Sequence, residues 1–329
     1  MYLLVDNKPE RLYNGKMEKI TNETTIRINK YLSSAGVCSR READQYTDAG
    51  RLTINGRPVS TGERVSPNAE ICLDGKLIQP ESRQVLLLFY KPRGIVCSTK
   101  KQRQETTVTE FLDYPVRIYP IGRLDKESEG LLLLTNQGDL VNRIMRAGNY
   151  HEKEYLVTVN KEVTPEFIRH MASGVPILDT ITRKCFVEKT GKNAFRIILT
   201  QGLNRQIRRM CSYLGYEVVS LKRIRIMNLT LSGLKSGEYR EIQPDEMKRL
   251  EQMLKNSSSK TITGGNYGNS PAANERAGQN IKQSGKSLLS GRSRDHGQSG
   301  VRRSVRSAGK TGEGNRNHTG RQPHSKRRL

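Results

Sequence analysis

Tryptophan is absent from the 329-residue sequence, and aromatic residues of all kinds make up only 5% of it. Long apolar runs are absent too. The longest, at residues 85–90, is far shorter than the roughly 18 residues that cross a bilayer. The first ten residues lack the basic start and the apolar stretch of a secretory signal. These absences disfavour a membrane-spanning or exported protein, and we expect a cytoplasmic one.

Cysteine and histidine are scarce and scattered. The five cysteines contain no Cys-x-x-Cys pair, and the five histidines form no cluster. This pattern predicts a reducing compartment and argues against a disulfide framework, a zinc ribbon or a redox dithiol. We expect no metal site.

Acidic residues are outnumbered by basic ones. The chain has 57 Lys and Arg against 33 Asp and Glu, a net charge of +24, which makes nucleic acid the default partner. Residues 256–329 carry 15 basic and three acidic residues in a stretch rich in Gly, Ser and Asn. Such a segment buries too little apolar area to offset its ordering entropy, so we expect a disordered tail. It serves either as a non-specific RNA-binding arm or as a solubilising tail. Residues 1–25 are expected to form a short, poorly ordered extension.

Residues 26–82 are expected to form a small α+β module. Apolar residues recur near helical spacing over 26–35. The sequence SRRE at 39–42 is a capping box that begins a second helix, and Asn55-Gly56 and Asp74-Gly75 predict tight turns between short strands. Two arginines at a helix amino-terminus oppose the helix dipole, so a phosphate bound there would be favoured.

Residues 83–255 alternate strand-like and helix-like segments. VLLLFYKP, GLLLLTN and AFRIILT have the pattern of buried strands, and KEYLVTV that of a half-buried one. Thr164-Pro165 predicts a helix start, and apolar residues at helical spacing from Leu203 to Leu214 predict another helix. Because there is no regular βαβ phasing, we expect an α+β fold with a mixed or antiparallel sheet flanked by helices.

Asp125 is the candidate reactive group. It lies in IGRLDKESEGLLLLT, in a polar loop before a very apolar strand, between Arg123 and Lys126. A carboxylate held among cations stays ionised, which suits a nucleophile or a base. An ordinary loop ion pair would use the same residues, so this loop by itself does not decide the function.

Longer stretches of sequence carry a family resemblance. RINKYLSSAGVCSRREADQYTDAGRLTINGRPV resembles the S4 RNA-binding domain, and the stretch around Asp125 resembles the signature of the RsuA branch of pseudouridine synthases. KPRG at 91–94, KEY at 153–155 and QGLNRQIRRM at 201–210 are similar to the other motifs of that branch, in the same order. RAGNYHEKEYLVTV and QGLNRQIRRMCSYLGYEV are most similar to its large-subunit type F. Together these matches cover residues 26–255.

The resemblance implies a role for each motif residue. Asp125 is the catalytic aspartate, Tyr155 stacks against the flipped uracil, and Arg208 pairs with Asp125 and orients it. Arg123 fills the gap that the flipped uridine leaves in the RNA. Arg208 is favoured over Arg205 because its Gln-Ile-Arg context matches the arginine of the family, and Arg205 then contacts RNA. The other expected RNA contacts are Leu124, Lys126, Gln206 and Ile207 in the catalytic domain, and Arg40, Arg41 and Arg51 in the S4 domain.

The implied reaction isomerises uridine: the N1–C1′ bond breaks, the base turns, and C5 joins C1′. No atom is gained, so no redox cofactor, phosphate donor or metal is expected. Asp125 either attacks the ribose or the base, or removes the C2′ proton to form a glycal-like intermediate. A detached uracil must be retained, which favours an apolar pocket, for which Ile121, Leu124 and Leu203 are candidates.

The expected substrate is 23S rRNA, with small-subunit rRNA or a tRNA anticodon arm as alternatives. A non-catalytic ribosome-assembly protein on the same scaffold would be expected to lack Asp125, Tyr155 or Arg208, and all three are present. A DNA-binding regulator would need a helix-turn-helix unit, and none is recognisable. We expect a monomer.

Overall fold

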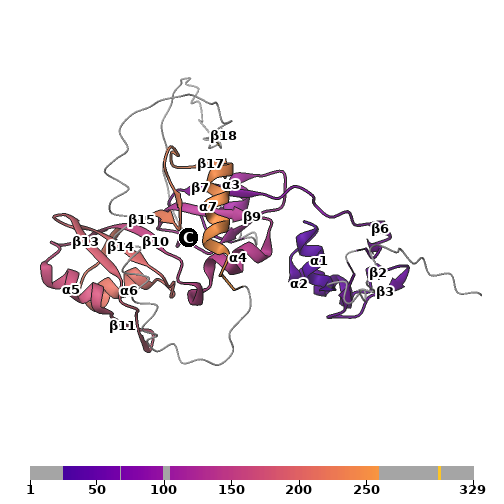
Figure 1. Ribbon diagram of the computed structural model, residues 1–329, viewed down its shortest axis with the longest axis horizontal. Helices are drawn as coiled ribbons and strands as arrows, with labels where there is room; N and C mark the ends of the chain where they lie inside the picture. Colours follow the sequence, from indigo (N-terminus) through magenta and orange to yellow (C-terminus); the bar gives the residue numbers. More distant parts are fainter. Residues whose placement is uncertain (1–24, 67, 99–103, 259–302, 305–329) are drawn as a thin grey trace, which may run out of the picture.

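The computed structural model describes residues 25–66, 68–98, 104–258 and 303–304 (Figure 1). A small amino-terminal domain, at the right of Figure 1, precedes a larger domain built on one long mixed sheet. The predicted extension at 1–25 lies outside the described residues except for Thr25, and so does the predicted tail except for residues 256–258 and 303–304. In the described part of the chain, no helix has the length and apolarity needed to span a membrane.

The amino-terminal domain packs two helices against short strands. Ile28 does begin a helix, but Ile26 pairs with Val65 in a short ladder, so the helix starts two residues later than the apolar spacing predicted. Strands β3, β2, β5 and β6 form an antiparallel sheet in that order. The elements are β1 (Ile26–Arg27), α1 (Ile28–Ser34), α2 (Arg40–Asp48), β2 (Leu52–Ile54), β3 (Arg57–Pro58), β4 (Arg64–Val65), β5 (Ile71–Leu73) and β6 (Lys76–Leu77).

The local signals of this domain are confirmed. Ser39 Oγ accepts a hydrogen bond from the backbone N–H of Glu42 at 3.2 Å, and the backbone N–H of Ser39 donates to the Glu42 carboxylate at 2.7 Å. This capping box fixes the start of α2. Asn55-Gly56 and Asp74-Gly75 adopt the left-handed conformation that a two-residue hairpin turn requires.

The larger domain carries the remaining elements. They are β7 (Leu86–Lys91), α3 (Val108–Leu112), β8 (Tyr119–Ile121), β9 (Glu129–Thr135), α4 (Gly138–Met145), the 3-10 helix η1 (Ala147–Asn149), β10 (Lys153–Val159), α5 (Pro165–Ser173), β11 (Pro176–Ile177), β12 (Thr180–Ile181), β13 (Phe186–Gly191), β14 (Ala194–Leu199), α6 (Gln206–Tyr213), β15 (Val218–Ile226), β16 (Leu229–Thr230), β17 (Glu238–Glu241), α7 (Pro244–Leu254) and β18 (Arg303–Ser304).

The central sheet is mixed, as predicted. Its order is β13-β14-β10-β15-β9-β7-β17-β18, with β16 added to β15 and β8 to β9. All of these pairings are antiparallel except that of β15 with β9, which is parallel. At this junction a Cβ on Gly130 would lie 2.2 Å from the backbone oxygen of Arg223, so only glycine permits the strands to approach this closely. The close approach holds the loop before β9 against the other half of the sheet.

Separate cores cover the two halves of this sheet. All six residues of β7 are buried: Leu86 and Leu88 pack toward α4 and α7, while Leu87 and Phe89 pack toward α3 on the opposite face. The strands β10 and β14 bury Val157, Phe195 and other residues against α5 and α6. The loop that carries Asp125, between β8 and β9, therefore lies between well-packed hydrophobic cores.

Candidate active site

Asp125 lies in the turn between β8 and β9, at the junction of the two halves. The backbone N–H of Ser128 donates to the Asp125 carbonyl at 3.0 Å, which closes the turn. The Asp125 side chain is 30% exposed, so its carboxylate remains accessible to a substrate.

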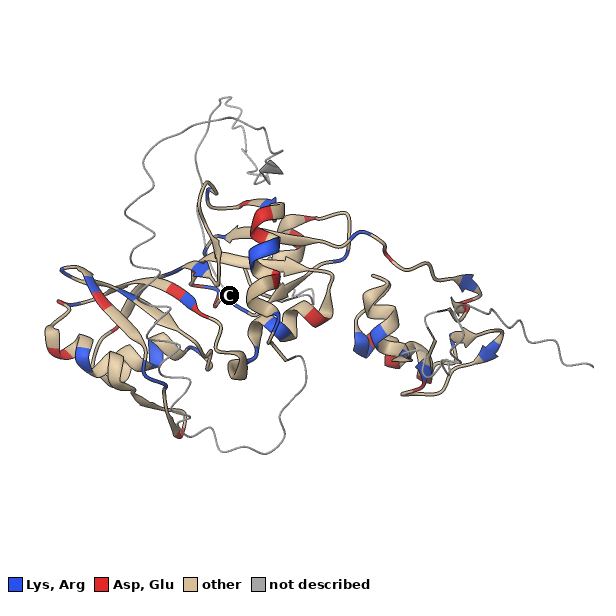
Figure 2. Ribbon diagram, viewed as in Figure 1, with Lys and Arg blue, Asp and Glu red and all other residues tan. Residues whose placement is uncertain are grey.

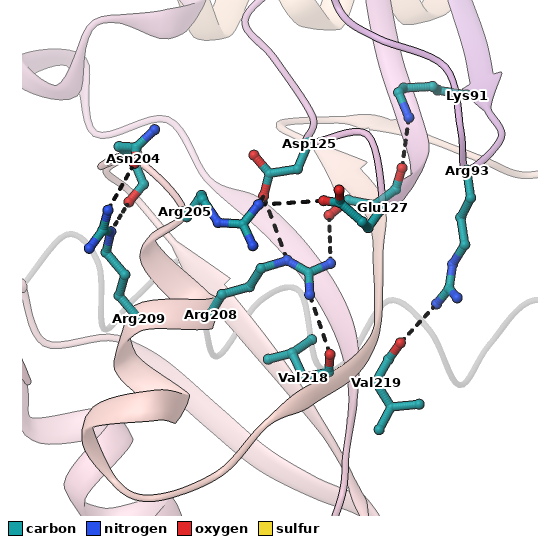
Figure 3. Close-up of polar contacts among 11 residues, drawn as sticks. Lys91, Arg93, Asp125, Glu127, Asn204, Arg205, Arg208, Arg209, Val218 and Val219 are labelled. Carbon is teal, nitrogen blue, oxygen red and sulfur yellow. Dashed lines mark hydrogen bonds and ion pairs between the residues drawn. The ribbon is translucent and has the colours of Figure 1, made fainter. Parts of the chain in front are cut away.

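Two arginines from the α6 region reach this carboxylate (Figure 3). Arg205 Nη1 and Arg208 Nε each lie 3.6 Å from Asp125 Oδ2. Distance alone therefore does not favour Arg208 over Arg205 as the partner of Asp125. Arg208 is the more fixed of the two, since it also donates to Ser128 Oγ at 3.2 Å and to the Val218 carbonyl at 3.3 Å. Burial, the largest cause, and the nearby Arg205 charge lower the pKa of Arg208.

Arg205 is more exposed and is shared between two carboxylates. Its Nη1 lies 3.4 Å from Glu127 Oε2 as well as 3.6 Å from Asp125. Arg205 also adopts a left-handed backbone conformation, with φ of 49°, immediately before α6. Non-glycine residues in this conformation are uncommon and concentrate at functional sites.

The start of α6 corrects a prediction. Helical spacing placed Leu203 in the helix, but α6 begins at Gln206 because the left-handed Arg205 breaks the helical path. Gln206 is buried, and its Oε1 accepts from the backbone N–H of Leu203 at 3.1 Å. The structure thus gives Gln206 an internal partner, although the resemblance implied an RNA contact for it.

Asp125 and Tyr155 line the same small cavity, of about 90 Å³. Tyr155 projects from β10, where it pairs with Ile197 of β14. Of the three apolar candidates for this pocket, Leu124 and Leu203 line it, whereas Ile121 has no exposed surface and packs in the core beside β8. Ile121 was therefore wrongly assigned, because the alternation of β8 turns its side chain inward. The remaining lining residues are Arg123, Ser128, Leu199, Gln201, Gly202, Arg205, Gln206, Ile207, Arg208 and Leu221.

Two buried polar residues that sequence reasoning did not single out hold this site together. Ser128 has no exposed surface, and its carbonyl accepts from Lys91 Nζ at 2.8 Å. Burial lowers the pKa of Lys91, which also donates to the Pro92 carbonyl at 2.9 Å. The KPRG and RLDKES motifs therefore meet at Ser128, and both lie in stretches that the family resemblance had already marked.

The expected RNA-binding residues differ in their surroundings. Arg123 is exposed beside Asp125, whereas Lys126 forms an ion pair with Glu105 at 2.9 Å. Arg51 forms an ion pair with Asp74 and lies 4.5 Å above the Tyr46 ring. Lys126 and Arg51 are thus each paired with an acidic residue of the chain, so their geometry does not by itself indicate an RNA contact.

Arg40 and Arg41 lie at a groove between the two domains, with a volume of about 450 Å³. Lys30 also lines it, together with Arg117 and the start of α4 from the larger domain. Figure 2 shows basic residues on the side of the amino-terminal helices that is turned toward the larger domain. In the described part of the chain, Lys30 has an ion-pair partner in Asp139, at 3.1 Å, and the three arginines have none.

Across residues 25–66, 68–98, 104–258 and 303–304, no three His, Cys, Asp or Glu side chains converge as metal ligands do. The site described above is instead a carboxylate, two arginines and a tyrosine around a cavity.

Comparison with known proteins agrees with this geometry. Residues 85–213 match the RNA pseudouridylate synthase family, and residues 26–71 match the S4 domain. The chain is 52% identical over 239 residues to the dual-specificity RNA pseudouridine synthase RluF of Escherichia coli (strain K12), covering 72% of this chain and 82% of the relative. It is 34% identical over 235 residues to the ribosomal large subunit pseudouridine synthase B of Bacillus subtilis (strain 168), covering 69% of this chain and 96% of the relative.

A solved structure, described as the crystal structure of pseudouridylate synthase, superposes with a TM-score of 0.52 at 28% identity. The match covers 68% of this chain and 99% of that one. The resemblance found in the motifs is thereby confirmed: the chain belongs to the RNA pseudouridine synthase family, as an isomerase that carries an S4 domain in front of its catalytic domain.

Proposed function

We propose that this enzyme converts uridine to pseudouridine in 23S rRNA, with a tRNA anticodon arm as a second substrate. The name of one relative, which is called dual-specific, supports two kinds of RNA substrate, and the name of the other supports a large-subunit target. The observation that carries the chemistry is the accessible Asp125 carboxylate, with Arg205 and Arg208 both 3.6 Å away and Tyr155 lining the same cavity.

In this proposal each side chain around the cavity has one task. Asp125 is the reactive carboxylate, and the partly buried Arg208 holds its orientation. Tyr155 offers a ring face to the extruded base, which must leave its helix before its glycosidic bond can be reached. Arg123, exposed beside Asp125, enters the gap in the RNA. Leu124 and Leu203 retain the uracil while it turns between breakage of N1–C1′ and formation of C5–C1′.

The amino-terminal domain would then position the RNA. Arg40 and Arg41 are exposed, face the larger domain and have no carboxylate partner within the described residues, so phosphates can reach them. We include the tail after residue 258 as a further source of phosphate contacts, because its excess of basic residues favours any RNA. The protein would act as a monomer in the cytoplasm, where its substrates are made.

Pseudouridine mapping of rRNA and tRNA from cells that lack this protein tests the proposal. One site in 23S rRNA should lose its pseudouridine, and a site in a tRNA anticodon arm should lose its own. Returning the wild-type gene should restore both sites, whereas an Asp125→Asn variant should restore neither. An unchanged pattern of pseudouridines in the 23S rRNA of the deletion strain would refute the large-subunit assignment.

A further inference from the structure

Gln201 is a buried residue of the catalytic cavity, and its carboxamide nitrogen has no hydrogen-bond partner in the part of the chain that the structure describes. The residue is 9% exposed, and its Nε2 has no partner among the described residues. It lines the cavity together with Asp125 and Tyr155. Buried polar groups in folded proteins almost always have partners, so one without a partner in a binding cavity calls for an explanation.

The neighbouring Gln206 shows what a glutamine with a structural role looks like in this fold. It is also buried, at 4% exposed, but its Oε1 accepts from the backbone N–H of Leu203, and its Nε2 lies 3.7 Å from Met210 Sδ. Gln206 therefore stabilises the turn before α6. Gln201 stabilises no such turn, although burying its carboxamide costs a similar desolvation free energy.

The position of Gln201 suits contact with a base held by Tyr155. Gln201 lies two residues after β14, which is the neighbour of β10. In this pair Ile197 faces Tyr155 and Leu199 faces Lys153, so Gln201 lies beyond the end of the ladder, and it meets Tyr155 only across the cavity that both residues line. A ring that stacks on Tyr155 would present one of its edges to residues at the end of β14.

The chemistry of a carboxamide matches one edge of uracil. That edge presents the N3–H donor between two carbonyl acceptors, O2 and O4. A carboxamide presents one acceptor oxygen and one NH₂ donor group side by side, so it can accept from N3–H and donate to a flanking carbonyl. Turning the base over about its N3–C6 axis exchanges O4 for O2 and preserves the match, because N3–H stays opposite the amide oxygen. Cytosine carries an acceptor at N3 and an amino group at C4, so the carboxamide would have to turn its NH₂ group toward N3 to pair with it.

We propose that Gln201 is a specificity-determining residue that reads the N3–H and one carbonyl of the flipped uracil. This inference rests on the proposed function, because it requires a uracil in the cavity. Sites built to hydrogen-bond a substrate group reject analogues that lack it, because a buried polar atom is then left without a partner.

The test measures single-turnover rates, at saturating RNA, on three versions of one hairpin that carry uridine, 2-thiouridine or 4-thiouridine at the target position. Sulfur is a weak acceptor, so the wild-type enzyme should be slowed about tenfold by one of the two replacements. Gln201→Met keeps the length of the side chain but removes both polar atoms. Its rate on uridine RNA should fall by a similar factor, and its additional loss on the sensitive thio-RNA should disappear.

Gln206→Met is the matched control, because it removes a buried glutamine that has an internal partner. It should lower the melting temperature and leave the thio-to-uridine rate ratio at its wild-type value. Equal wild-type rates on all three RNAs would overturn the proposal even if the Gln201 variant failed to fold, and so would the same thio penalty in Gln201→Met as in wild type. Failure of the wild-type enzyme to modify the uridine hairpin would instead count against the proposed function.

Discussion

Arg208 Nη2 lies 3.2 Å from the hydroxyl oxygen of Ser128, a fully buried residue 80 positions earlier in the chain. The backbone N–H of the same serine closes the Asp125 turn at 3.0 Å, and its carbonyl accepts from Lys91 at 2.8 Å. Ser128 thus connects the loop that carries the carboxylate to the arginine that faces it. Ser128 lines the cavity but has no exposed surface, so we regard it as a positioning residue that acts through Arg208.

Ser128→Ala should therefore lower kcat with little change in KM. The loss of one buried hydrogen bond of about 1 kcal/mol corresponds to roughly a fivefold decrease in rate, if the bond is needed to orient Arg208. Steady-state kinetics on a target hairpin check this, with the exposed Ser212→Ala on α6 as control. An unchanged kcat for Ser128→Ala would show that the hydrogen bond between Arg208 and Ser128 is not needed to orient Arg208.

Arg205 is shared between the carboxylates of Asp125 and Glu127, at 3.6 and 3.4 Å. An RNA phosphate that binds Arg205 must compete with the Glu127 carboxylate. A hydrogen bond from its own backbone N–H, and then Arg205, lower the pKa of Glu127, so this competitor is ionised. Glu127→Gln weakens this competitor, so KM for RNA should fall several-fold while kcat stays near the wild-type value. Arg205→Gln should have the opposite effect on KM.

Glu166→Gln, on the exposed start of α5, controls for the change in net charge. If Glu127→Gln and Glu166→Gln lower KM by the same factor, the effect comes from the overall charge. Competition between Glu127 and RNA phosphate for Arg205 would then be contradicted.

Much of this architecture could be predicted from the sequence because the signals were local. The short apolar runs of β7 and β9 favour buried strands, and the Ser39–Glu42 capping box specifies a helix start from four consecutive residues. The start of α6 could not be predicted in this way. Its apolar spacing extends back to Leu203, and only the left-handed conformation of Arg205 ends it.

Contacts between distant segments were also beyond the sequence pattern. Nothing near Ser128 indicates that it meets Arg208, and nothing near Arg51 indicates its ion pair with Asp74. The family resemblance implied roles for Asp125, Tyr155 and Arg208 and favoured Arg208 over Arg205, but it did not indicate that both arginines lie 3.6 Å from the Asp125 carboxylate. Such pairings depend on the tertiary structure, which the periodicity of single elements does not encode.

The groove between the domains gives a prediction about affinity. Arg117 belongs to the larger domain and lines the groove with Arg40 and Arg41 of the S4 domain. The chain from Tyr119 to Asp125 spans at most about 20 Å, so one RNA can occupy both the groove and the catalytic cavity. Arg117→Gln should weaken the binding of a folded rRNA fragment and should lower the slope of log affinity against log salt by about 0.7–0.9.

The single-turnover rate of Arg117→Gln on saturating RNA should match wild type, since the residue lies outside the catalytic cavity. Arg169→Gln, which removes an exposed arginine of α5, provides the control. Equal salt slopes for Arg117→Gln and Arg169→Gln would show that the groove contributes only general positive charge.

The lowered pKa of the buried Lys153 predicts how the free energy of unfolding depends on pH. Lys153 is 3% exposed, and its Nζ donates to the His151 carbonyl at 2.9 Å. Burial, with a smaller contribution from Arg223, lowers its pKa from 10.5 to about 8. Between these two values the unfolded chain binds more protons than the folded one, so stability rises with pH over this interval. Below pH 8 the full cost of burying the charge applies, about 3 kcal/mol.

Lys153→Met removes this cost together with the hydrogen bond to His151. The free energy of unfolding of the variant minus that of wild type should therefore be largest at pH 7 and should decline steadily between pH 8 and 10. Urea titrations at several pH values measure the difference. A difference that stays constant from pH 7 to 10 would contradict a depressed Lys153 pKa.

The central claim is that the Asp125 carboxylate performs the chemistry, and Asp125→Asn tests it most directly. The amide has nearly the same shape but cannot act as a nucleophile or a base. Asp113→Asn is the matched control, because Asp113 ends α3 in a left-handed conformation that asparagine also tolerates. We predict that purified Asp125→Asn binds the target RNA at least as tightly as wild type, since the lost carboxylate makes no favourable contact with phosphate and no longer competes for Arg205. It should form no pseudouridine in a single turnover, while Asp113→Asn reacts at the wild-type rate. Pseudouridine formation by Asp125→Asn at more than a trace of the wild-type rate would contradict the account.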